Sequence, residues 1–403
     1  MSDFKGLREQ GVYVDKTDML YRLVERAGCC YANIISRPDG FGKSTMLSTL
    51  RYIYEGRREL FKGLAIDRED YDWKPWPIIF MDMADAVGET VEEVEAKLLE
   101  VVRKAVGEDL WGDDDYTSTY ASGAFMHALF ALKRREQCAV ILIDNFDAPI
   151  RAVLDRPKLA EEIVRLLNNV YIHLKCDCAS IHFLLMAGEM PYATLLTSVF
   201  SGVNNLDNIS LETPYLTLCG FTGEELERYF GPQLHAHAEK MGLPYAVYRR
   251  ELDRWIGGYR FDYDSESLVN PLYLKRVLEA QAETFDDRWV PACRSVLLKF
   301  AAETDHRETE RARRWKEDPE RDYGKTDYAD GRDLYQWCCD PERFSTLGLL
   351  FRAGYFTVLK AYEPEMALRH VGIPNEAVRR DLRRLGLKVS EPPDIEKLEE
   401  TQD

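Results

Sequence analysis

A lysine, two hydroxyl groups and two glycines occur together near the N-terminus, in an order that suits phosphate binding. An apolar run over residues 32–35 precedes a turn, and an amphipathic segment follows it. Free N–H groups at the start of a helix attract phosphate oxygens. The lysine adds a charge for the β- and γ-phosphates, and the serine after it can ligate Mg²⁺. The predicted nucleotide-binding residues are Arg37, Pro38, Gly40, Phe41, Gly42, Lys43, Ser44 and Thr45.

This stretch departs from the usual phosphate-binding pattern at its first position. The pattern G-x-x-x-x-G-K-[ST] has glycine where this chain has Arg37. A Gly-Lys-Ser triplet by itself is common, so an ordinary helix cap is the alternative interpretation.

A second motif later in the chain favours the phosphate-binding interpretation. The apolar, β-branched run Ala139–Ile143 ends in Asp144, as a Walker B strand does, and this aspartate would hold Mg²⁺ beside the loop. Another buried strand, within Trp76–Met83, lies between the two motifs. The order predicts an α/β fold of the additional-strand class of P-loop NTPases, a parallel sheet with helices on both faces.

Composition restricts the class of protein. The 403 residues include 53 basic and 70 acidic side chains, a formal charge of −17 that argues against wholesale nucleic-acid or anionic-membrane binding. No apolar run approaches membrane-spanning length, and the N-terminus has no signal-peptide pattern. The nine cysteines include adjacent pairs and form no plausible disulfide framework. These features predict a protein of the cytoplasm.

Hydrophobic periodicity predicts the remaining elements. Further predicted strands are Ile181–Met186 and an edge strand, Tyr215–Phe221. Predicted helices of the first part are Asp18–Ala27, Glu89–Val106, Ala124–Leu132 and Leu159–His173. Those of the second part are Thr222–Phe230, with Thr222 and Glu225 as a capping box, Tyr245–Trp255 and Pro271–Glu279.

The C-terminal part reads helix, two strands, helix, over Phe344–Ala353, Tyr355–Lys360, Met366–Val371 and Asn375–Leu385. This order predicts a small winged-helix-like module. The charge-dense stretch Asp305–Arg332 is predicted to be a solvated helix or a hinge. The predicted domains are a P-loop domain (1–221), a helical lid (222–304), a charged hinge (305–337), the winged-helix-like module (338–390) and a disordered tail (391–403).

Several short segments, in order, make the chain similar to one family. They are YVDKT (Tyr13–Thr17), RPDGFGKS (Arg37–Ser44), LFKGL (Leu60–Leu64), LIDNFDAPI (Leu142–Ile150), FSGVNNL (Phe200–Leu206), GFTGEEL (Gly220–Leu226), GGYRF (Gly257–Phe261), VNP (Val269–Pro271), LLFRAGYFTV (Leu349–Val358) and IPNEAV (Ile373–Val378). The chain thereby resembles the predicted AAA-ATPase-like proteins, relatives of archaeal-type P-loop ATPases. The resemblance accounts for Arg37 and implies that Lys43 and Ser44 bind the nucleotide and Asp144 binds Mg²⁺.

The chain departs from this family at positions that matter for hydrolysis. The family has two basic residues where Asp39 and Gly40 stand here, and a Walker B glutamate where this chain has Asn145. Asparagine cannot take a proton from water, and losing a general base typically costs ~10²–10⁴-fold in rate. Asp147 is the candidate substitute. After the fourth strand a Thr-Gly pair is replaced by Ala187 and Gly188.

Two further positions carry open alternatives. Arg260 is either a structural residue or a finger that stabilises charge on the transferred phosphate. Asn204 and Asn205 either brace their loop or contact the nucleotide, and the sequence does not decide between these roles. Many relatives also carry a PD-(D/E)xK nuclease, which we expect to be absent because the similar string at 393–397 lacks a folded core around it.

The sequence therefore predicts a protein that binds ATP and Mg²⁺ and hydrolyses ATP slowly or not at all, with the nucleotide as structural ligand or switch. One alternative is an active Mg-dependent ATPase, and another is a protein-interaction scaffold that binds no nucleotide. The expected partners are the nucleotide and another protein or a second copy of the chain. We expect no membrane, and nucleic acid only through the C-terminal module.

Overall fold

The computed structural model describes most of the chain. The described residues are 3–28, 32–107, 118–154, 156–189, 206–262, 265–280, 285, 322–324, 327–330, 346–361, 368–384 and 387–390. The chain divides into two compact units. Unit 1 consists of Met1–Arg37 and Gly42–Cys219, and unit 2 of Pro38–Phe41 and Gly220–Asp403. The tip of the predicted phosphate loop therefore belongs to unit 2, although the residues on either side of it belong to unit 1.

Unit 1 is built on a five-stranded parallel sheet, as predicted. The strands are β1 (Ala32–Ser36), β2 (Ile78–Asp82), β3 (Ala139–Asp144), β4 (Ile181–Gly188) and β5 (Leu206–Asn208). Their order across the sheet is β2-β3-β4-β1-β5. Every residue of β3 is buried, as expected for a central parallel strand covered on both faces. The carboxyl ends of these strands meet at one edge, where α/β proteins place their ligands.

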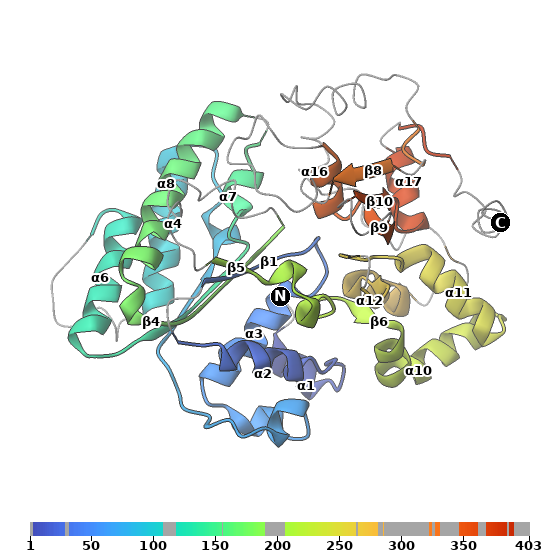
Figure 1. The fold of residues 1–403 in the computed structure, drawn as a ribbon, viewed down its shortest axis with the longest axis horizontal. Helices are drawn as coiled ribbons and strands as arrows, with labels where there is room; N and C mark the ends of the chain where they lie inside the picture. Colours follow the sequence, from blue (N-terminus) through green and yellow to red (C-terminus); the bar gives the residue numbers. More distant parts are fainter. Residues whose placement is uncertain are drawn as a thin grey trace. The chain divides into compact units, whose positions relative to one another are not determined.

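Helices cover the sheet of unit 1 on both faces, which confirms the predicted fold class. They are α1 (Phe4–Glu9), α2 (Thr17–Glu25), α3 (Lys43–Tyr54), α4 (Val91–Val106), α6 (Ala121–Arg134), α7 (Ala148–Arg151) and α8 (Pro157–Cys176). Figure 1 shows α4, α6 and α8 grouped together and α3 apart from them. The helix α4 packs against β2, α6 and α8, whereas α3 packs against β3 and β4.

The predicted edge strand Tyr215–Phe221 is wrong. The strand beside β1 is β5, and residues Thr213–Tyr215 instead form a short 3-10 turn. Pro214 in this turn has no N–H to give to a sheet. The carbonyls of Tyr215 and Leu216 accept hydrogen bonds from the Arg37 guanidinium, so they are not available to a neighbouring strand.

Unit 2 contains helices and two small antiparallel sheets. The helices are α10 (Gly223–Lys240), α11 (Tyr245–Ile256), α12 (Pro271–Ala280), α16 (Thr346–Arg352) and α17 (Glu376–Arg384). One sheet pairs β6 (Phe221–Thr222) with β7 (Leu268–Val269), and the other has the order β8-β10-β9, with β8 (Asp327–Asp330), β9 (Thr357–Ala361) and β10 (Leu368–Gly372). The predicted capping box of Thr222 and Glu225 is confirmed, because each side chain accepts from the other residue's backbone N–H.

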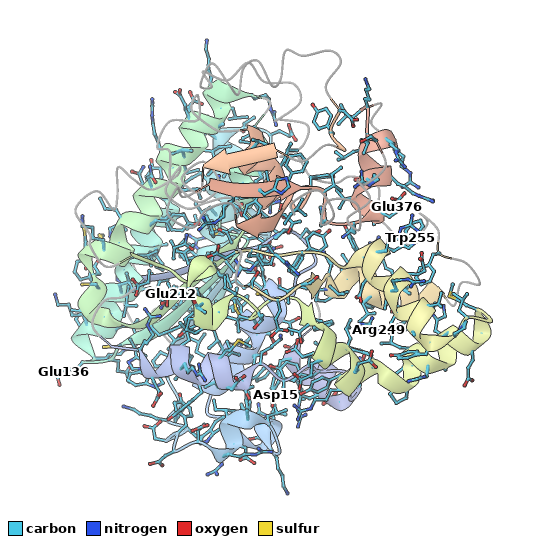
Figure 2. All side chains as sticks on the ribbon, turned by 45° about the vertical axis from the view of Figure 1, so that its right-hand side comes forward. Asp15, Glu136, Glu212, Arg249, Trp255 and Glu376 are labelled. Carbon is cyan, nitrogen blue, oxygen red and sulfur yellow. The ribbon has the colours of Figure 1, made fainter. Side chains whose placement is uncertain are left out.

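Part of the charged stretch Asp305–Arg332 forms a strand. Residues Asp327–Asp330, predicted to lie in a solvated helix or hinge, form β8 and pair with β10. The segment reads Asp-Tyr-Ala-Asp, which is short and lacks the apolar–polar alternation that predicts a strand. Elsewhere in this unit, α11 packs against α17, and the Arg380 guanidinium lies 4.3 Å from the ring centroid of Trp255. Trp255 and Glu376 mark this contact in Figure 2.

Candidate functional site

The helix α3 begins at Lys43, directly after the loop that follows β1. Gly42, its N-cap, has a φ of 90°, a left-handed conformation that glycine adopts without steric cost. Lys43 is buried, and its Nζ donates to the Arg37 carbonyl at 2.9 Å. The lysine charge and the N–H groups of the first turn of α3 are therefore presented at the same point, which suits an anionic ligand.

Asp144 ends β3, an interior strand of the sheet, and is completely buried. Its Oδ1 accepts the Asn145 N–H at 3.0 Å. Its Oδ2 accepts no hydrogen bond from the described part of the chain. Burial raises the pKa of the Asp144 carboxyl, and the charge of Asp82 acts in the same direction, whereas the neighbouring Ser44 hydroxyl and the Lys43 ammonium lower it.

These residues fit a magnesium ion. A buried carboxylate oxygen without a hydrogen-bond partner is costly unless a ligand satisfies it. Ser44 supplies a hydroxyl beside that carboxylate, and hard cations such as Mg²⁺ prefer oxygen ligands and retain several waters. Asp144 and Ser44 are thus close to one another, and both would be ligands of the ion.

Arg37 fastens the base of the loop. Only 2% exposed, it donates from Nη1 to the Ser36 carbonyl at 2.9 Å and from Nη2 to the Ser210 carbonyl at 2.9 Å. Weaker bonds reach the carbonyls of Tyr215 and Leu216. These contacts explain why arginine can replace the glycine at the first position of the loop. The guanidinium anchors the loop to the segment after β5. Direct contact between Arg37 and a nucleotide stays a prediction.

The loop tip, Pro38–Phe41, is held by residues of unit 2. The Asn270 side chain donates to the Asp39 carbonyl at 3.0 Å, and the N–H of Leu272 donates to the Gly40 carbonyl at 3.2 Å. A Cβ on Gly40 would lie 2.7 Å from Asn270 Oδ1, so only glycine fits. Phe41 is buried in edge contact with aromatic rings of the same unit.

The side chain of Asp39 is exposed, and its Oδ1 accepts the Gly40 N–H at 2.8 Å. The carboxylate is therefore bound to its own loop. An inward carboxylate would repel phosphate, whereas this one is exposed and its charge faces solvent.

Asn145, at the expected position of the Walker B glutamate, is tied to a neighbouring strand. Its φ of 50° is left-handed, a conformation that asparagine tolerates better than most residues. Its Nδ2 donates to Oδ1 of Asp82, the last residue of β2, at 2.9 Å. A glutamate at this position would bring a second carboxylate to Asp82.

Asp147, the candidate substitute for the missing glutamate, belongs to a buried ionic cluster. Its Oδ2 lies 3.1 Å from Nε of Arg151 and accepts the Glu189 N–H at 3.1 Å. Arg151 also pairs with the Glu189 carboxylate at 2.8 Å. Gly188 lies against this cluster, since a Cβ there would be 2.7 Å from Asp147 Oδ1 and 2.5 Å from the Phe146 ring. To activate water, Asp147 would therefore have to give up its ion pair with Arg151 or its hydrogen bond with the Glu189 N–H.

The remaining predicted residues lie in different places. Thr45 is in the first turn of α3, and its carbonyl accepts from the Thr49 hydroxyl at 2.8 Å. Arg260 lies in unit 2, where its backbone bonds to Thr357 on β9. Asn204 and Asn205 lie outside the described residues.

Sequence reasoning missed Asp82 as a residue of the site. The signal was present, because Asp82 ends an apolar strand just as Asp144 does. The missing information was that β2 and β3 are neighbours and that Asp82 and Asp144 are register partners. The pairing of Arg151 with Asp147 and Glu189 was also missed, although the spacing of Asp147 and Arg151 allows a contact across one helical turn.

Two sequence comparisons relate part of this chain to known proteins. The family model AAA-ATPase_like, described as Predicted AAA-ATPase, matches residues 1–198. An uncharacterized protein from the vnfD 5' region of Azotobacter chroococcum mcd 1 is 31% identical over 280 residues. The match covers 69% of this chain and 50% of that protein, so the chain spans about half the length of this relative.

Two solved structures show distant similarity. The Aeropyrum pernix Orc1 protein in complex with DNA aligns with 96% of this chain and 95% of its own, at 12% identity and a TM-score of 0.35. C. elegans PCH-2 aligns with 69% of this chain and 55% of its own, at 10% identity and a TM-score of 0.23. Both TM-scores are low, so neither structure carries an argument about this chain. None of the helices within the described ranges has the length and apolar character needed to cross a membrane.

Proposed function

Because residues 1–198 belong to the predicted AAA-ATPase family, we propose that this protein binds Mg-ATP at the start of α3. Lys43 and the N–H groups of the first helical turn bind the phosphates. Ser44 and Asp144 hold the magnesium ion, which neutralises phosphate charge when bound. Arg37 shapes the loop that presents these groups.

The environment of Asp144 is the observation that carries this proposal. This carboxyl has no exposed surface, and one of its oxygens accepts no hydrogen bond from the described residues. Burying such a group lowers the stability of the ligand-free protein. The neighbours of this carboxyl include the Ser44 hydroxyl and the Lys43 ammonium. A divalent cation with a bound triphosphate would complete this set of oxygens and positive charge, which is the arrangement that nucleotide-binding loops use.

We further propose that hydrolysis is slow and that the nucleotide acts as a structural ligand or switch. Asn145 cannot accept a proton from water, and Asp147 is engaged with Arg151 and the Glu189 N–H. A nucleotide present at 100 times its Kd stabilises the bound state by ~2.7 kcal/mol. That free energy is sufficient to bias a conformational equilibrium about a hundredfold.

Thermal unfolding with and without millimolar Mg-ATP tests binding. We expect the melting temperature to rise in the natural protein and in Lys62→Ala, a control lysine on the exposed surface of unit 1. The rise should disappear in Lys43→Ala. Absence of a shift in the natural protein would favour the alternative of a scaffold that binds no nucleotide.

Phosphate release distinguishes the switch from the active ATPase. Rapid, repeated turnover that Lys43→Ala abolishes would favour the ATPase alternative, with Asp147, Arg260 or a neighbouring subunit completing the site.

We also propose that the protein has another protein or a second copy of the chain as partner, and that it contacts nucleic acid only through the C-terminal elements. The proposal also includes a cytoplasmic location, supported by the free thiols of the four cysteines that lie among the described residues.

A further inference from the structure

A second carboxylate lies beside the magnesium residue at the carboxyl edge of the sheet. Asp82 ends β2 and is the register partner of Asp144 on β3. Register partners on neighbouring strands point to the same face, so the two carboxyl groups are close. Asp144 is completely buried, with Oδ2 lacking a hydrogen-bond donor among the described residues, whereas Asp82 is partly exposed. The buried oxygen suits a cation, and the more open carboxylate remains accessible to water.

Asp82 is fixed in position by bonds to only one of its oxygens. The Asn145 Nδ2 donates to Oδ1 at 2.9 Å, and the Ala84 N–H donates to the same atom at 3.0 Å. Within the described ranges Oδ2 accepts no such bond. The side chain is therefore oriented and still has an oxygen with which to bind a water molecule.

The pair Asp82 and Asn145 carries one carboxylate and one amide. A Walker B glutamate places the carboxylate on the residue after β3, whereas here that residue carries the amide and the neighbouring strand carries the acid. Residue 145 has no carboxylate, but the Asp82 carboxylate lies within hydrogen-bond distance of its side chain.

We propose that Asp82 is the carboxylate that activates water in the slow hydrolysis of ATP by this protein, and that Asn145 is the residue that positions it. This inference rests on the proposed binding of Mg-ATP at α3. The water oxygen forms a bond to the γ-phosphorus, and the bond from that phosphorus to the bridging oxygen breaks, with its electron pair leaving on ADP. The proton of the water passes to the free oxygen of Asp82 and then to solvent.

Single-turnover hydrolysis, with protein in excess over γ-labelled ATP, tests the assignment of Asp82. We expect Asp82→Asn to bind Mg-ATP, as judged by its thermal shift, but to hydrolyse it ~10²–10⁴-fold more slowly than the natural protein. Asp85→Asn is the matched control, because Asp85 is exposed in the short turn that follows β2. It should change neither binding nor rate.

Exchanging the two residues tests the positioning role of Asn145. The variant Asp82→Asn with Asn145→Asp keeps one carboxylate, one amide and the bond between them, and aspartate also tolerates a left-handed φ. Its melting temperature should exceed the value expected from adding the losses of the two single variants. Its hydrolysis rate should recover part of the loss seen in Asp82→Asn, and recovery of the melting temperature without recovery of the rate would leave the pair a structural role only.

The outcomes separate this inference from the proposed function. If Asp82→Asn hydrolyses ATP at the natural rate, or if the natural protein binds Mg-ATP and completes no turnover, the role of Asp82 is overturned and nucleotide binding stands. If the natural protein shows no thermal shift with Mg-ATP, the proposed function fails, and this inference fails with it.

Discussion

At the scale of single residues, Asp144 shows a conflict between stability and ligand binding. Burial raises the pKa of this carboxyl above its value in the unfolded chain. Ionisation of Asp144 therefore costs folding free energy. The cost is absent below the unfolded pKa and grows as the pH rises through the folded pKa. Retaining a charged group in such a place is expected where a cation binds.

Replacing this carboxyl should stabilise the free protein and weaken nucleotide binding. We expect Asp144→Asn to raise the free energy of unfolding without ligand at neutral pH by ~1 kcal/mol, the lower end of the cost of an unsatisfied buried group. The same variant should lose most of the thermal shift with Mg-ATP. Chemical denaturation with and without ligand measures both effects, and a less stable free variant would contradict the cation-site interpretation.

Gly188 illustrates a residue required by space and not by backbone conformation. In Gly188→Ala the new Cβ would meet the Phe146 ring at 2.5 Å, so β4 and the turn after β3 would have to separate. We expect a loss of ~1–3 kcal/mol, the usual cost of overpacking. Denaturant unfolding measures the loss. Gly231→Ala is the control, because nothing lies near its Cβ on α10, and a similar loss there would remove the steric explanation.

At the scale of elements, the loop between β1 and α3 is positioned by anchors at its base and at its tip. Arg37 binds carbonyls of the segment after β5, and the tip is held by Asn270 and the N–H of Leu272. The conformation presented to a phosphate is therefore set by side chains far away in sequence. This arrangement allows arginine where the usual motif has glycine.

Arg37→Lys tests whether the guanidinium anchor is necessary. The three N–H donors of lysine lie on a single nitrogen, so they cannot reach several carbonyls as the planar fork of arginine does. Since buried carbonyls would lose their donors, we expect a loss of ~2 kcal/mol or more in the free energy of unfolding. Arg26→Lys is the control, because its ion pairs with Asp207 and Glu212 are exposed and contribute little. Equal losses in the two variants would contradict a special role for Arg37.

At the scale of the whole molecule, the predicted phosphate-binding residues belong mainly to one unit. Lys43, Ser44 and Asp144 lie in unit 1, while the loop tip Pro38–Phe41 belongs to unit 2. The loop between β1 and α3 thus passes from unit 1 to unit 2 and back along the chain.

Hydrogen–deuterium exchange locates the effect of the nucleotide. With Mg-ATP we expect slower exchange in residues 42–54 and 139–147, and also at the loop tip 38–41, because bound phosphates order the N–H groups around them. The helix α6, on the surface of unit 1, serves as internal control and should not change. Protection limited to unit 2 would contradict nucleotide binding at α3.

Local sequence patterns determined much of this protein. The order of strand, loop and helix around Lys43, the buried strand that ends in Asp144 and the capping box of Thr222 depend on neighbours in sequence, and each is found where predicted. The parallel α/β fold followed from the same alternation of elements.

Only the tertiary structure decided which distant residues meet. Strand order and register bring Asp82 to Asn145, because β2 is a neighbour of β3, and no local pattern encodes that adjacency. The edge strand was misplaced for a related reason, since the Arg37 guanidinium, distant in sequence, takes the carbonyls of the segment predicted to be a strand. Side-chain chemistry was therefore readable from the sequence, whereas its partners depended on how the sheet is assembled.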